Sequence, residues 1–234
     1  MLQGKRSERS RTHILDAALI LFSHRGYGAT SVQDIADAAS VSKGNVYHHF
    51  ADKESIFREL LDQYFAAMSR PDFPFNRALA TGTFPENLEE LGRATRHVVE
   101  KYRAHVALIY VDVVEFDGSH IRKFYEDMSQ RFDHFMKETG IETELRSKLA
   151  EGLSPISAVM LATRILFNYF SVEILFGVKD HFGKDTDEAV REIARILRHG
   201  MLREGQPVAS RAAARAPRRT PAPARKRPAA RKPR

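Results

Sequence analysis

The segment from Ser31 to Phe50, SVQDIADAASVSKGNVYHHF, constrains the fold of this chain more than any other stretch. Asp34 follows Ser31 at the spacing of a capping box, which marks the start of a helix. Ser42 is a second residue of the type that caps helix N-termini, and it follows a Ser-containing break at residues 39–42. Two short helices joined by a tight turn are therefore expected, and this arrangement is a helix-turn-helix.

The second of these helices carries side chains suited to contacts with nucleic acid. Ser42, Lys43, Gly44 and Asn45 stand at its N-terminal end, where a recognition helix needs short or polar groups near base edges. The lysine is suited to guanine acceptors and the asparagine to adenine, while the glycine lets the backbone come close. Tyr47 and His48 are expected to reach flanking phosphates, which orient a protein without reading sequence; the alternative for Tyr47 is a place in the core beside Val46. His49 is given no role.

Further phosphate contacts are expected at two helix starts. Thr30 and Ser31 open the first short helix, where backbone N–H groups and the helix dipole favour an anion. Lys53 opens the helix that follows the motif and is placed to hold another phosphate.

The rest of the chain before residue 205 has the apolar periodicity of helices. Ile14, Ala18 and Phe22 recur at helical spacing, and Gly26-Tyr27-Gly28 ends that segment. Further helices are expected from Asp52 towards Ser69, from Pro85 to about Lys101, and over residues 104–116, 121–139, 154–177 and 185–202. No convincing alternating strand pattern appears, so the sequence predicts an all-α body.

Charge is distributed unevenly along the 234 residues. The net charge is +7, but residues 205–234 hold ten of the 37 bases and no acid, which leaves 27 bases against 30 acids in the body. This tail consists mostly of Ala, Pro and Arg, so it is expected to be disordered. It is either a solvated extension or a basic arm that adds phosphate contacts beside a DNA site.

Other features limit the compartment and the chemistry. Cysteine is absent, which excludes disulfides and thiolate nucleophiles. The charged N-terminus does not resemble a signal peptide, and the apolar stretch 156–178 is interrupted by Arg164, Asn168 and Glu173. We interpret that stretch as a buried helix rather than a membrane span, and we expect a cytoplasmic protein with no membrane partner.

In order and spacing, three phrases of the motif region resemble the TetR family of transcriptional regulators. They are G-Y-x-x-T-S-x-x-x-I-A, V-S-K-G-x-x-Y-x-H-F and D-K-E-x-[LI]-F, and the resemblance covers roughly Arg9 to Tyr64, about a quarter of the chain. It implies that seven positions contact operator DNA: Thr30, Gln33, Lys43, Asn45, Tyr47, His48 and Lys53.

The resemblance also implies an organisation and a function. We expect an N-terminal three-helix helix-turn-helix domain over residues 1–52, a helical bundle for effector binding and dimerisation over 53–204, and the basic tail. The implied protein is a homodimeric, ligand-responsive repressor that binds a palindromic double-stranded operator and pairs through residues 156–178 and 185–202. The alternative from another class is an architectural or non-specific DNA-binding protein driven by the tail.

The effector is expected to be a small, largely apolar molecule. Arg164 and Asn168 are the first candidates to line its pocket, with Tyr110 and His105 as weaker ones, because polar groups on apolar helices must find partners. Those partners are either a ligand in a mostly apolar cavity or groups within the fold and at the dimer interface.

Catalytic, metal and cofactor sites are not expected. Residues 40–43 match S-x-x-K, but they lie in the turn of the motif and no partner motif follows. No H-E-x-x-H is present, and His97 and His105 fall on different expected helices.

Overall fold

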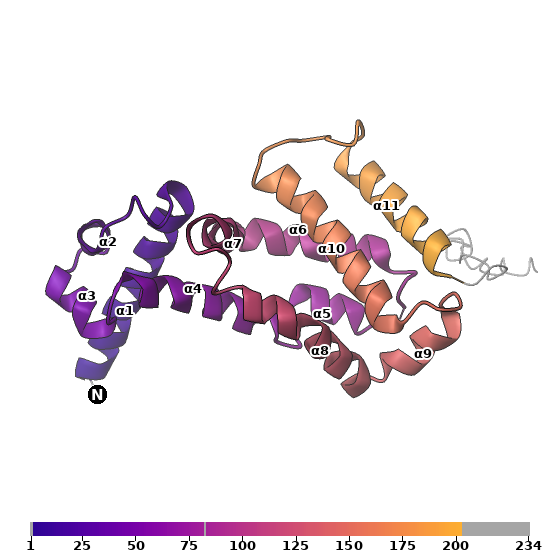
Figure 1. The fold of residues 1–234 in the computed structure, drawn as a ribbon, viewed down its shortest axis with the longest axis horizontal. Helices are drawn as coiled ribbons and strands as arrows, with labels where there is room; N and C mark the ends of the chain where they lie inside the picture. The colour runs from indigo at the N-terminus through magenta and orange to yellow at the C-terminus, as the bar shows by residue number, and fades with distance from the viewer. Residues whose placement is uncertain (1, 82, 203–234) are drawn as a thin grey trace, which may run out of the picture.

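The computed structural model describes residues 2–81 and 83–202, and this part of the chain forms eleven helices with no strand (Figure 1). Its one β-type pairing is an isolated bridge between Leu149 and Leu202. The all-α prediction is therefore confirmed for the described residues. The predictions for the tail, residues 205–234, lie outside them.

Four helices form the N-terminal end of the molecule: α1 (Leu2–Arg25), α2 (Val32–Ala38), α3 (Lys43–His49) and α4 (Lys53–Met68). The caps expected from the sequence are present. The Ser31 hydroxyl accepts the Asp34 N–H at 3.1 Å, and the Ser42 hydroxyl accepts the Asn45 N–H at the same distance. Asp52 caps α4 in the same way, so short local signals set the start of all three later helices.

The body contains α5 (Pro74–Leu79), α6 (Leu88–Lys101), α7 (Arg103–Glu115), α8 (Arg122–Glu138), α9 (Ile141–Lys148), α10 (Pro155–Ile174) and α11 (Thr186–Met201). The sequence did not predict α5 or α9. Residues 70–74, which contain two prolines, were expected to end the preceding helix, and α4 does end at Met68; Pro74 in addition occupies the first turn of α5, where a missing N–H costs nothing. Thr139 and Gly140 separate α8 from α9, and Gly140 is left-handed, with φ of 73°.

One boundary differs from its prediction. Pro85 was expected in the first turn of a helix, but it follows a cis peptide bond after Phe84, and α6 begins only at Leu88. Phe84 is buried in the core of the body, so the segment before α6 serves packing instead of extending the helix.

Two hydrophobic cores are present, and α7 belongs to the N-terminal one. Val106, Leu108 and Ile109 of α7 are buried with the apolar faces of α1 to α4, while α5, α6, α9, α10 and α11 supply most of the second core. Hydrophobic packing therefore crosses the domain boundary expected after residue 52. Figure 1 shows α4 running from the helix-turn-helix towards α5 and α8.

The helix α10 is long and apolar enough to cross a membrane by length and composition alone, a test that core helices also pass. One of its faces, including Ala158, Ala162 and Leu166, lies in the core of the body. This packing accounts for the apolar character of the helix.

Candidate functional site

The outer face of α3 presents the polar side chains that the sequence singled out. Lys43, Gly44, Tyr47 and His48 are exposed, while Val46 is 1% exposed and holds the inner face against the core. Tyr47 is 50% exposed, so its alternative place in the core is wrong. Contact between this face and DNA stays a prediction.

Three other predicted residues lie beside this face. Ser42 caps α3, and Asn45, one helical turn in, is half buried with its Oδ1 unpaired among the described residues. The Gln33 amide donates to Asp37 on the surface of α2 at 2.8 Å. A Cβ added at Gly44 would meet only the Ser42 hydroxyl, at 3.9 Å, so packing within the described residues does not require glycine there.

Thr30 is not available to a phosphate through its side chain. It is fully buried, and its hydroxyl donates to the Gly26 carbonyl at 2.9 Å, so the predicted contact is wrong for this side chain. Ser31 is exposed, but its backbone N–H and hydroxyl both donate to the Asp34 carboxylate, at 2.8 and 2.5 Å. These hydrogen bonds lower the pKa of Asp34, and its negative charge already occupies the start of α2.

Lys53 has a different role from the one expected. Its ammonium donates to the carbonyls of Tyr27 and Thr30, at 2.8 and 2.9 Å, and lies 3.9 Å from the centre of the Tyr27 ring. Burial lowers its pKa. The side chain therefore fastens the turn between α1 and α2 to the start of α4, and two of its three N–H bonds are taken.

Glu115, at the end of α7, also holds the turn between α1 and α2 through hydrogen bonds. Its two carboxylate oxygens accept the backbone N–H groups of Tyr27, at 2.8 Å, and Gly28, at 2.5 Å. The sequence analysis missed this contact, since the partners are 87 and 88 residues apart and no local pattern marks them.

A histidine joins the loop after α7 to α4. His120 lies with Nδ1 2.6 Å from Asp112 and Nε2 3.2 Å from Glu54, which is in the first turn of α4. Asp112 is fully buried and also accepts the Ile121 N–H at 3.2 Å. The start of α4 is thus connected to the body through side chains as well as through the chain.

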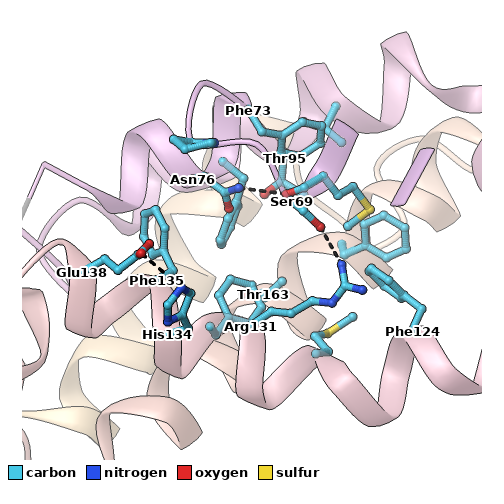
Figure 2. Close-up of a pocket in the computed structure, with 17 residues that line it drawn as sticks. Ser69, Phe73, Asn76, Thr95, Phe124, Arg131, His134, Phe135, Glu138 and Thr163 are labelled. Carbon is cyan, nitrogen blue, oxygen red and sulfur yellow. Dashed lines mark hydrogen bonds and ion pairs between the residues drawn. The ribbon is translucent and has the colours of Figure 1, made fainter. Parts of the chain in front are cut away.

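The body contains a cavity of about 270 Å³ between the end of α4, the segment 69–76, α6, α8 and α10 (Figure 2). Most of its lining is apolar: Met68, Pro71, Phe73, Phe75, Val98, Phe124, Met128, Phe132, Phe135 and Phe167. The polar part of the lining is Ser69, Asn76, Thr95, Arg131, His134, Glu138 and Thr163. Such a cavity has the composition of a site for a small apolar molecule.

None of the four predicted pocket residues lines this cavity. Arg164 and Asn168 are exposed, although their neighbours Thr163 and Phe167 do line it. One residue turns a helix by about 100°, so the predicted residues are on the same helix as part of this lining but on a different face of it.

The two weaker pocket candidates pack elsewhere. Tyr110 lies edge-on to Phe176, with ring centres 5.7 Å apart. His105 stacks on Tyr64 at 5.7 Å, and burial lowers its pKa. The aromatic residues of α8 at helical spacing were the signal that sequence reasoning overlooked.

No group of three or more His, Cys, Asp or Glu side chains in the described ranges could hold a metal ion.

The comparisons with known proteins agree with this geometry. Residues 14–60 match the family model described as "Bacterial regulatory proteins, tetR family". The repressor KstR2 of Rhodococcus jostii is 55% identical over 51 residues, 22% of this chain and 25% of its own length. KstR2 of Mycobacterium tuberculosis strain H37Rv is 35% identical over 126 residues, 52% of this chain and 60% of its own. The aligned regions thus cover between a quarter and about 60% of the length of these relatives.

The fold extends the similarity over most of the chain. NalD of Pseudomonas aeruginosa, the secondary repressor of the MexAB-OprM multidrug efflux pump, superposes with a TM-score of 0.58 at 24% identity. The superposition covers 85% of this chain and 99% of NalD, and it shows that the two share a fold. The helix-turn-helix region, residues 14–60, is therefore that of the TetR family of bacterial regulatory proteins, and the described chain shares the helical fold of NalD.

Proposed function

We propose that this protein is a sequence-specific DNA-binding transcriptional repressor that acts as a homodimer and releases its operator when a small molecule binds. The exposed polar face of α3 carries the proposal, because a capped helix anchored by Val46 presents Lys43, Gly44 and Tyr47 outwards. Relatives such as KstR2 are named as repressors, and this supports repression rather than activation.

In this proposal α3 enters the major groove. Lys43 and Asn45 contact base edges, Gly44 allows close approach, and Tyr47 and His48 hold phosphates on either side. Gln33 and the start of α2 and α3 lie beside the same groove. A fixed α3 is needed for such contacts, and Lys53 and Glu115 supply that fixation through the turn at residues 26–30.

Dimerisation is proposed through α10 and α11. Leu161 of α10 and Ile196 of α11 are 47% and 62% exposed, and such an interface would cover these apolar side chains. Arg164 and Asn168 follow Leu161 on the exposed side of α10, so the interface is our assignment for these two residues. A symmetric dimer would present two copies of α3 to successive major grooves about 34 Å apart.

The helix α4 offers a route from the cavity to the DNA-binding unit. Met68 at its end lines the cavity, and Lys53 at its start holds the turn before α2. A ligand that displaces the end of α4 therefore moves the attachment point of the helix-turn-helix. The effector is proposed to be largely apolar, the compartment cytoplasmic, and no cofactor, membrane partner or catalytic step is part of the mechanism.

Binding to the operator and to random DNA of equal length, at matched salt, tests the proposal. We expect operator binding to be at least a thousandfold tighter. Lys43→Ala should weaken operator binding and relax the preference at one base, while Lys123→Ala, an exposed lysine on α8, should change neither. Equal affinity for both DNAs would instead support an architectural protein driven by the tail.

A further inference from the structure

Arg131 is the one charged side chain in the lining of the cavity whose charge is not matched by an ion pair among the described residues. Its Nη1 donates to the Ser69 hydroxyl at 2.6 Å, and its guanidinium lies 5.4 Å from the centre of the Phe124 ring. No carboxylate of the described residues lies within 4.0 Å of it. The acid in the lining, Glu138, pairs with His134 at 3.1 Å.

The hydroxyl and amide groups of the lining use their hydrogen-bond donors on the backbone. Ser69 donates to Phe65, Thr95 to Leu91 and Thr163 to Val159, each at a carbonyl 2.7 to 2.9 Å away. The Asn76 amide donates to the carbonyls of Met68 and Arg70, both at 2.8 Å. Arg131 therefore holds most of the free donors of the cavity, since a guanidinium has five N–H groups and hydrogen-bonds with only one of them within residues 2–81 and 83–202.

The position of Arg131 gives the cavity a charged end near solvent and an apolar end inside the fold. Figure 2 shows its guanidinium directed towards Ser69, with Phe124 beside it. The arginine is exposed on one side, whereas Phe73, Phe75 and Val98 on the far elements are buried. A bound molecule thus meets a cation near solvent and aromatic surface inside.

A planar cation with free donors favours a carboxylate, which accepts two parallel N–H bonds from one guanidinium. We propose that the effector is an amphiphile, with an apolar body inside the cavity and a single carboxylate head held by Arg131. This inference rests on the proposed ligand-responsive function and names the chemical class of its ligand.

Two matched sets of probes test the ligand class on the full-length protein by titration calorimetry. The flexible set is decanoate, decanol and decylamine, and the rigid set is 2-naphthoate, 2-naphthol and 2-naphthylmethylamine. At least one carboxylate should bind about tenfold or more tightly than its alcohol and its amine. Equal binding within both sets, tighter binding of an amine, or no binding of either carboxylate would overturn the proposal.

The variant Arg131→Gln tests the contribution of the head group to affinity separately from the contribution of the apolar body. This variant should lose the preference for the carboxylate and keep the affinity for the alcohol, which shows that the cavity is intact. Arg122→Gln is the control, because Arg122 is on the same helix and does not line the cavity. A carboxylate preference that survives in Arg131→Gln would overturn the assignment.

Operator binding without any probe is measured on the same samples. Arg131→Gln should bind the operator as the unmodified protein does, and the carboxylate should release only the latter. Operator binding without carboxylate binding would overturn the ligand class alone, whereas failure to prefer the operator would overturn the repressor function.

Discussion

Replacing Lys53 by Met tests whether this residue fastens the turn before α2 or holds a phosphate. The methionine keeps most of the aliphatic stem and removes the ammonium, and with it the hydrogen bonds to Tyr27 and Thr30. The variant should be less stable and bind DNA more weakly, because the helix-turn-helix is no longer held to α4.

The size of the effect follows from the contacts. Each hydrogen bond from a charged donor contributes about 1.5–3 kcal/mol, and the contact with the Tyr27 ring adds about 0.5–1 kcal/mol. Relief of the buried charge offsets part of this sum, since burial already lowers the pKa of Lys53. A net loss of about 3 kcal/mol remains, which corresponds to a fall in Tm of about 6–12 °C for a chain of this size.

Circular dichroism melting measures the stability, and the salt dependence of operator affinity measures the phosphate contact. Lys53→Met should lower Tm and leave the slope of log affinity against log salt unchanged, because no counterion is released by a lysine buried against carbonyls. Lys43→Met, at an exposed position with no bond to other described residues, is the stability control and should keep its Tm.

The opposite pattern would refute this reasoning. A slope that becomes shallower by about 0.9, together with an unchanged Tm, would return Lys53 to the phosphate contact expected from the sequence.

Three further predictions concern the junction, the pH response and the tail. Glu115→Gln should lower the free energy of unfolding in urea by about 1 kcal/mol, because an amide has one acceptor oxygen and can no longer accept the N–H groups of both Tyr27 and Gly28. Glu126→Gln, at an exposed acid on α8, should not lower it, and an equal loss in both variants would contradict a role for Glu115 at this junction. Burial lowers the pKa of His105 below its ordinary value of 6.5, so the unfolded chain binds the proton more readily and stability should fall as the pH drops below about 6.5. His105→Gln should reduce the difference between urea midpoints at pH 7.5 and 5.5, and an undiminished difference would assign it to other groups. Removing residues 205–234 should flatten the salt slope of DNA binding, whereas an unchanged slope would leave the tail as a solvated extension.

Local signals predicted the N-terminal helices well. The caps at Ser31, Ser42 and Asp52 and the apolar spacing before Gly26 each depend on residues within one or two turns of one another. Such interactions are readable from one sequence because the partners are close in the chain.

Contacts between distant segments were not predictable in the same way. Whether Thr163 or Arg164 faces the cavity depends on the rotation of α10 about its axis. Packing of α10 against α6 and α8 determines that rotation. The roles of Lys53 and Glu115 arise because the turn at Tyr27 lies between α4 and α7 in space. A single sequence does not specify these neighbours.

Because Glu115 of α7 binds the turn at Tyr27 and Gly28, the N-terminal unit is less interchangeable between relatives than its family motif suggests. A Cβ at Gly26 or Gly28 would lie 2.7 or 2.9 Å from the carboxylate oxygens of Glu115, so a side chain there would displace this carboxylate from its hydrogen bonds to the turn. Gly26 also has a φ of +86°, which disfavours a side chain by itself, whereas at Gly28 the only close atom is this carboxylate oxygen. A chimera that receives residues 1–52 from a relative without glycine at position 28 would therefore lose the hydrogen bonds between Glu115 and the turn, and with them part of the fixation of the transplanted helix-turn-helix.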